Sequence, residues 1–237
     1  MSFISSNFSS SGRLGLGALM MAAMVFVTGC AGTNTATAAG QFDDFFIDVR
    51  NDRAPKVKDA LSRGLSPNTR GADGSPAIME AIKEDAWGVY DVLLNAKGVD
   101  LNIQNPAKET PLMYLAIKGD VPRATDLVKR GAEVNQAGWT ALHYAATIGN
   151  VELIKLFIAN YAYIDAAAPN ETTPLMMAAR ADHFDAVKLL LEEGADSTLK
   201  NQLGMDAADF AKSMGHTTLA NALRERINSD LKRRGGK

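Results

Sequence analysis

A short motif recurs four times along this chain of 237 residues and limits its fold more than any other feature. The copies begin at Ser75, Thr110, Thr140 and Thr173, at intervals of 35, 30 and 33 residues. A nearly fixed period in this range is typical of stacked helical repeats, because one helix pair cannot bury its apolar face alone. The sequence therefore predicts a continuous strip of core shared between neighbouring repeats.

Each copy also carries local signals for a pair of helices. Pro follows Ser or Thr in three of the four copies, as in Thr110-Pro111. The hydroxyl is expected to accept a hydrogen bond from a free N–H of the first helix, and Pro suits the first helical position. An apolar stretch such as residues 151–158 predicts the second helix, and Gly131 and Gly194 are expected to end such helices in the left-handed conformation.

The repeated segments Thr140-Ala-Leu-His-Tyr-Ala-Ala146 and Thr173-Pro-Leu-Met-Met-Ala-Ala179 resemble the ankyrin repeat, and the resemblance covers roughly residues 42–230. It implies an all-α solenoid of stacked helix-turn-helix units. Residues 42–74 are expected to form an N-terminal capping repeat. The segment from Asp206 to Ile227 is expected to form the C-terminal cap.

Two residues depart from the pattern. Glu80 stands where a buried residue is expected, and an unpaired buried carboxylate is costly. We therefore expect either a slight rotation of this helix or a pairing of Glu80 with a nearby base such as Lys83 or Arg50. Tyr161 stands where other repeats have Gly, and a bulky residue rarely adopts positive φ, so a distorted helix end is expected. Tyr161 and Tyr163 then either form an exposed aromatic pair or pack on the outer helices.

The N-terminal residues 1–29 are interpreted as a lipoprotein signal peptide. Arg13 precedes an apolar run from Leu14 to Thr28, which is shorter than the ~20 residues of a spanning helix. The run ends before Cys30, the single cysteine, in a pattern that resembles a bacterial lipobox and implies lipidation there. An ordinary secretory signal or a short hydrophobic anchor is the alternative. Ala31 in place of Asp favours the outer membrane, facing the periplasm.

The remaining domain boundaries follow from composition. Residues 30–41 are small and uncharged and are expected to be a flexible tether. Residues 42–230 are the expected ankyrin-repeat domain. Residues 231–237 form a basic tail that is expected to be disordered, either solvated or in contact with anionic lipid or peptidoglycan.

Charge and residue usage argue against several function classes. Residues 31–221 carry 18 basic against 25 acidic residues, and this acidic body does not favour nucleic acid as a partner. The sequence offers no phosphate loop and no nucleophile elbow, and its three histidines lack metal-ligand spacing. We therefore expect no catalytic residue, metal, cofactor or small-molecule substrate. The resemblance implies that His143 bonds the backbone between repeats, whereas His183 and His216 are expected to cap helices.

The resemblance implies that the protein binds an unidentified protein partner through a concave face. The residues carried over to that face come from the fingers between repeats and from the first helices: Glu109, Trp139, Thr172, Met205, Ile117, Lys118, Thr147, Ile148, Arg180 and Ala181. The short interval before Trp139 leaves two interpretations of its ring, a partner-binding anchor or a lid over Pro111 or Tyr144. The alternative function is a structural or protective subunit that stabilises an envelope enzyme.

Overall fold

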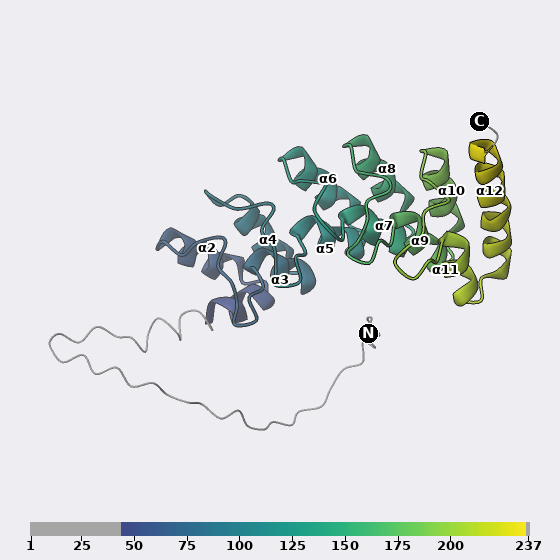
Figure 1. Ribbon diagram of the computed structural model, residues 1–237. Coiled ribbons are helices and arrows are strands. Elements are labelled where there is room, and N and C mark those ends of the chain that lie inside the picture. The colour runs from purple at the N-terminus through teal and green to yellow at the C-terminus, as the bar shows by residue number, and fades with distance from the viewer. Residues whose placement is uncertain (1–43, 236–237) are drawn as a thin grey trace, which may run out of the picture. The chain divides into compact units, whose positions relative to one another are not determined.

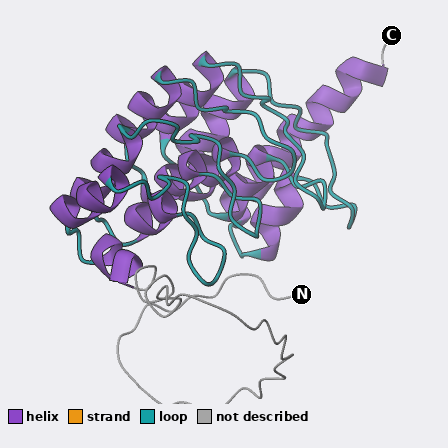
Figure 2. Ribbon diagram, turned by 90° about the vertical axis from the view of Figure 1, so that its left-hand side faces the viewer, coloured by secondary structure: helices purple, strands orange, loops and turns teal. Residues whose placement is uncertain are grey.

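The computed structural model describes residues 44–235, which belong to one compact unit. The predicted signal peptide, Cys30 and the tether lie outside the described residues. Within these residues the structure consists of helices and loops, apart from one isolated bridge between Arg70 and Pro76 (Figure 2). After a helical stretch at 44–50, the helices are α2 Ala54–Ser62, α3 Ala77–Lys83, α4 Trp87–Leu94, α5 Pro111–Lys118, α6 Val121–Lys129, α7 Ala141–Ile148, α8 Val151–Ala159, α9 Pro174–Arg180, α10 Phe184–Glu192, α11 Ala207–Ser213 and α12 Thr217–Gly235.

The helices form two rows in sequence order (Figure 1). The first helices of successive repeats, α3, α5, α7, α9 and α11, pack one on the next, and each also packs on the second helix that follows it. The second helices α6, α8 and α10 stand in a neighbouring row. This arrangement confirms the predicted all-α solenoid of helix pairs.

The predicted capping chemistry holds in the three later repeats. The hydroxyls of Thr110 and Thr173 accept hydrogen bonds from the N–H groups three residues on, and Thr140 forms a capping box with His143. The expectation for Ser75 is wrong, because the residue that caps α3 is Pro76, without a side-chain hydrogen bond. The first repeat is therefore one residue out of the predicted register.

The turn between the two helices of a repeat confirms this register. One residue per turn adopts positive φ, and the series is Asp85, Gly119, Gly149, Asp182 and Gly215. Counting forward from Ser75 matches Glu80 with Leu115, but counting back from the turn matches it with Tyr114 and Tyr144. Ala81, which is 0% exposed, takes the position of Leu115.

The expectation for the Glu80 carboxylate is confirmed despite the changed register. Glu80 is buried, and its two oxygens lie 3.4 Å from Arg50 Nη1 and 3.5 Å from Lys83 Nζ. Arg50 belongs to the N-terminal capping repeat, so this contact joins the cap to the first full repeat. At this position the first repeat has a carboxylate, whereas the later repeats have an aromatic residue or methionine, as at Tyr144 and Met177.

The core follows the apolar positions of the motif, and Leu112, Leu142 and Leu175 are buried as predicted. Leu142 lies on the central helix α7, which packs on α5, α8 and α9. We expect Leu142→Ala to lower the free energy of unfolding by about 2–5 kcal/mol, because the lost side chain leaves a cavity between rigid neighbours. Urea unfolding followed by circular dichroism measures this change. The matched control, Leu231→Ala, should change stability little because Leu231 is exposed; equal losses for both variants would contradict the prediction.

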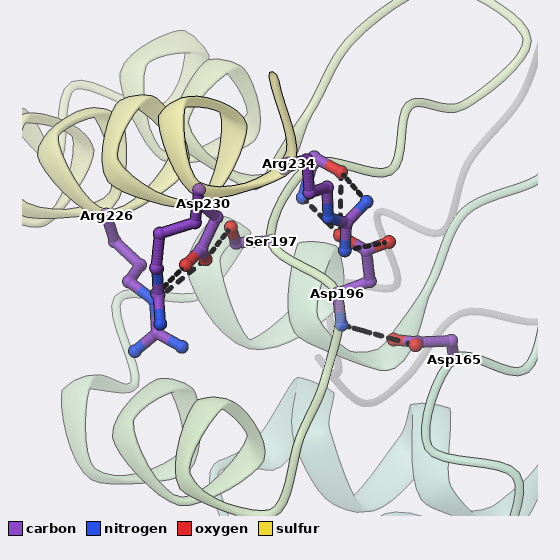
Figure 3. A network of polar contacts seen from close by, with 8 residues as sticks. Asp165, Asp196, Ser197, Arg226, Asp230 and Arg234 are labelled. Carbon is purple, nitrogen blue, oxygen red and sulfur yellow. Dashed lines mark hydrogen bonds and ion pairs between the residues drawn. The ribbon is translucent and has the colours of Figure 1, made fainter. Parts of the chain in front are cut away.

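The C-terminal end differs from the predicted disordered tail. Helix α12 continues to Gly235, so residues 231–235 are helical. Polar contacts hold this extension against the loop between α10 and α11: Arg234 Nη2 lies 2.9 Å from Asp196 Oδ2, and Ser197 Oγ donates to Asp230 Oδ2 at 2.7 Å (Figure 3). Arg226 and Arg233 also contact Asp230. These contacts explain why a highly charged stretch is ordered as helix.

The C-terminal network also shifts acidity. Burial raises the pKa of Asp196, but hydrogen bonds from Thr198 and Arg234 outweigh it and hold that pKa below its usual value. The pKa of Asp230 is likewise lowered, since the bonds from Ser197 and Arg226 exceed the effect of burial. Both carboxylates are therefore stabilised in their charged form.

Candidate partner-binding face

The residues carried over to the binding face fall into three groups by exposure. We call the surface made by the finger loops before each first helix and by the exposed side of the first helices the finger face. Ile117, Lys118 and Arg180 are exposed on it, and Trp139, Thr147, Ile148, Ala181 and Met205 are partly buried. Glu109 is partly buried, and Thr172 is fully buried.

Ile117 is the most exposed apolar residue among the predicted positions, with 48% of its surface accessible. It ends helix α5 next to Lys118, whose Nζ lies 2.9 Å from Asp85 Oδ1 and donates to Lys83 O at the same distance. Lys118 therefore links two repeats as well as facing solvent. Ile117 has no comparable structural role, so it is the clearest candidate for partner contact.

The ring of Trp139 contacts a residue that neither interpretation of it considered. It packs edge-on against His143, with ring centroids 5.1 Å apart. His143 is fully buried, so the indole covers its imidazole while one part of the ring stays accessible. The observed contact is with His143 and not with Pro111 or Tyr144, and the role of Trp139 as a partner-binding anchor stays a prediction.

Thr172 does not belong to the accessible finger face, and its prediction as a partner-binding residue is wrong. Only 1% of its surface is exposed, and its carbonyl oxygen lies 3.0 Å from His143 Nε2. Its Oγ1 is buried without a hydrogen-bond partner. The finger folds inward at this point because the histidine of the preceding repeat binds its backbone.

Glu109 has a structural role on the same face. Its Oε1 accepts a hydrogen bond from Tyr144 Oη at 2.7 Å, and its Oε2 accepts one from Asn105 Nδ2 at 2.7 Å. Burial and this hydrogen bond raise the pKa of Tyr144 above its ordinary value, so the phenol stays a donor. Glu109 thereby fixes the finger of one repeat to the first helix of the next.

His143 holds the centre of the stack as a neutral ring. Its Nδ1 accepts the N–H of Thr140 at 3.2 Å, and its Nε2 reaches the carbonyl of Thr172 in the next repeat. Burial lowers the pKa of His143 to about 4, although the backbone hydrogen bonds with Thr172 and Ala166 act in the opposite direction. The predicted bond from His143 to the backbone of a neighbouring repeat is confirmed.

The other two histidines also join repeats, which the capping prediction missed. His183 Nε2 lies 3.0 Å from Thr147 O, and His216 Nε2 lies 3.2 Å from Arg180 O. His183 opens α10 but makes no capping bond with its side chain. Thr147 also donates through Oγ1 to His143 O, so both its hydroxyl and its carbonyl are engaged. Thr147 is only partly exposed, and its role as a partner-binding residue stays a prediction.

A column of larger side chains on the finger face escaped the sequence prediction. Tyr114, Tyr144, Met177 and Phe210 each lie four residues after the residue that caps their helix, and all are partly buried. The constant offset from the motif could have identified them. Together with Ile117, Trp139 and Ile148 they make the middle of the finger face apolar.

Among residues 44–235 no cluster of three or more His, Cys, Asp or Glu side chains could hold a metal ion. No helix in that range combines the length and apolar character needed to cross a membrane.

The comparisons with known proteins agree with the repeat geometry. The family described as "Ankyrin repeats (3 copies)" matches residues 78–168 and 149–234. Human "Neurogenic locus notch homolog protein 1" is 29% identical over 135 residues, which are 56% of this chain and 5% of that protein. A "Putative ankyrin repeat-containing protein" of Treponema pallidum (strain Nichols) is 34% identical over 119 residues, which are 48% of this chain and 40% of the relative. The chain thus spans well under half the length of these relatives. From the matched repeats and their stacking, the chain belongs to the ankyrin-repeat family.

Proposed function

We propose that this protein is a lipid-anchored ankyrin-repeat module of a bacterial cell envelope that binds a protein partner through its finger face. Ankyrin repeats generally mediate protein–protein interaction and are typically non-catalytic. The lipid on Cys30 would attach it to the membrane, and the tether would hold the repeats within reach of envelope proteins. The outer membrane, with the repeats facing the periplasm, is the location we favour.

The apolar middle of the finger face carries the proposal of a protein partner. Ile117 is 48% exposed there and is not among the residues that pack against the core, and Trp139 and Ile148 of the next repeat are partly exposed on the same face. Aromatic residues of this kind contribute strongly to binding energy when a partner covers them. A purely solvated face would carry polar side chains at these positions.

Site-directed photocrosslinking in cells tests this face. A photoreactive residue at Ile117 should give a discrete adduct with one protein, because this side chain is exposed on the finger face. The matched control is the same residue at Lys155, which is exposed on the second helix α8. Adducts of equal yield at both sites, or none at Ile117, would contradict the proposal.

Metabolic labelling tests the anchor separately. We expect the full chain to incorporate radioactive palmitate and to fractionate with membranes. Cys30→Ser should abolish both, since Cys30 is the single cysteine of the sequence. Unlabelled wild-type protein would rule out the anchor and would leave the finger-face proposal standing.

A further inference from the structure

The loop after α8 carries two aromatic side chains that are exposed to solvent. Tyr161 is 87% exposed and Tyr163 is 70% exposed. Tyr161 also adopts a φ of 64°, so the tyrosine itself takes the left-handed conformation. The helix end is distorted as expected, because the preceding Asn160 has φ −106° and ψ 32°, whereas Arg130 in the previous repeat has φ −80° and ψ −3°. The left-handed conformation is uncommon and costly for a bulky residue. The preceding repeat has Gly131 at the same position, where this cost does not arise.

A neighbouring loop holds the two tyrosines rigidly. Asn135 Nδ2 donates to Tyr161 O at 2.7 Å, and Tyr163 N–H donates to Asn135 Oδ1 at 2.8 Å. Single exposed apolar side chains are ordinary on protein surfaces. Two aromatic residues on a backbone fixed in this way lose less conformational freedom on binding, and such residues often dominate interfaces.

The tyrosines lie in the middle of a row of loops, which we call the loop edge (residues 129–135, 159–165 and 192–198). The bonds of Asn135 join the first two loops. The third is joined to the second by Asp196 N–H, which donates to Asp165 Oδ1 at 3.0 Å (Figure 3). The three loops therefore stand side by side, in chain order, with the tyrosine pair at the centre.

The charges on either side of the tyrosines have opposite signs. Lys129 lies one repeat before Tyr161, and Glu193 lies one repeat after it, and both are exposed. Neither side chain has an ion-pair partner within 4.0 Å among residues 44–235, although nearby Arg130 is paired with Asp126 and Glu192 with Lys188. Glu133, in the same loop as Lys129, is also exposed and has no ion-pair partner in that range. Counting all charged residues, the first loop holds two bases and one acid and the third holds three acids, so the two flanks still differ in the sign of their net charge.

We propose that the loop edge binds the same edge of a second copy of this chain, around a two-fold axis at the tyrosine pair. In such an isologous contact each surface meets its own copy in the reverse direction. Lys129 of one protomer then faces Glu193 of its partner, and the same pair forms again on the other side of the axis. The edge is complementary to itself, whereas an anionic or cationic partner would meet one favourable and one unfavourable flank.

The tyrosines and the charges have separate tasks in this dimer. Offset or edge-to-face packing of the tyrosine rings supplies most of the affinity. The exposed ion pairs add little affinity but set the orientation of the two copies. The dimer uses the loop edge only, so it is independent of the proposed finger-face function.

Sedimentation equilibrium of the full-length chain in mild detergent tests the proposal. Wild type is expected to dimerise. The variant Tyr161→Gly/Tyr163→Glu gives this loop the Gly131 and Glu133 of the preceding repeat, and it should weaken dimerisation by at least about 30-fold. Its melting temperature should stay equal or rise, because Gly relieves the left-handed strain. A monomeric wild type, or a dimer that the variant does not weaken, would overturn the proposal.

Charge reversal tests the orientation. Lys129→Glu and Glu193→Lys should each weaken the dimer, because each places like charges across the axis. The double variant should restore the wild-type dissociation constant, because the reversed charges still face each other. Lys155→Glu, on the exposed side of α8, is the matched control and should change nothing. Failure of the double variant to recover would exclude this two-fold arrangement.

Discussion

Arg224→Met is expected to lower the free energy of unfolding by about 3 kcal/mol, although the substitution changes a partly exposed side chain. Arg224 donates through Nη1 to Asp206 Oδ2 at 2.6 Å and through Nη2 to Asp206 Oδ1 at 3.0 Å. The Asp206 side chain is only 2% exposed, whereas that of Arg224 is 41% exposed. Removing the guanidinium leaves a buried carboxylate without its counter-charge. We take the lower end of the range for broken buried pairs, because water can reach the arginine side.

The second role of Asp206 makes a compensating variant possible. Its carboxylate also caps α11 by accepting the N–H of Asp209 at 3.0 Å. Asp206→Ser keeps a capping oxygen and removes the charge. Arg224→Met/Asp206→Ser should therefore regain most of the stability lost by Arg224→Met alone.

Urea unfolding measures both variants, and an exposed pair provides the control. Arg63 and Asp59 lie 2.7 Å apart with side chains 63% and 62% exposed. Arg63→Met should cost at most about 1 kcal/mol, since water solvates the remaining carboxylate. If Arg63→Met and Arg224→Met cost the same, burial of Asp206 is not the cause of the effect.

The stacked helix pairs could be predicted from sequence because their signals are local. The capping threonines, and the proline that follows two of them, lie beside the helices that they begin, and they predicted the starts of α5, α7 and α9 well. The first repeat shows where this fails. Ser75-Pro76 looks like Thr110-Pro111 in sequence, but α3 begins one residue later than this match predicts. The cap at Pro76 and the positive-φ turn at Asp85 both show the shift.

The candidate face could be predicted only in part, because exposure depends on contacts between repeats. Thr172 occupies the same sequence position as Trp139, yet His143 binds its carbonyl and the side chain is buried. His183 was expected to act on its own helix, but its ring bonds Thr147 in the preceding repeat. The motif predicted that His143 bonds a neighbouring repeat, but the sequence around Thr172 and Thr147 does not show that these residues are the acceptors.

Tyr161 shows a different kind of limit. The rarity of positive φ for tyrosine predicted a distorted helix end, and Asn160 does depart from the dihedrals of Arg130, its counterpart one repeat earlier. Tyr161 nevertheless adopts positive φ, as Gly131 and Gly194 do. Bonds from Asn135 to both sides of the turn fix that geometry. Contacts with the neighbouring loop here outweigh the intrinsic backbone preference of tyrosine. The Tyr161 ring is 87% exposed, so its own burial does not offset the strain of the left-handed conformation.

The protein is expected to lose about 3 kcal/mol of stability between pH 6.5 and pH 4 through His143 alone. Burial lowers the folded-state pKa of His143 to about 4, whereas the unfolded chain takes up its proton near the ordinary value of 6.5. Within this window the unfolded state binds a proton that the folded state does not. The contribution of His143 is therefore fully present above pH 6.5 and falls as the pH drops toward 4.

Carboxylates also titrate in acid, so the effect of His143 must be measured as a difference. The lowered pKa values of Asp196 and Asp230 reduce stability at still lower pH. Asp165 acts in the opposite sense: burial raises its pKa, so protonation of the folded state begins first and adds stability as the pH falls. A variant that changes only His143 keeps all three contributions in common with wild type.

His143→Met is that variant, because Met113 and Met176 occupy the same position in the repeats on either side. At pH 7.5 we expect it to be less stable than wild type by about 1 kcal/mol, since the bond to Thr172 O is lost. Near pH 4.5 the order should reverse, because Met does not titrate and wild type has lost most of the contribution of His143. Urea unfolding at several pH values measures both curves. Parallel curves for wild type and variant would show that His143 titrates alike in the folded and unfolded chain, and that its burial has no effect on acid stability.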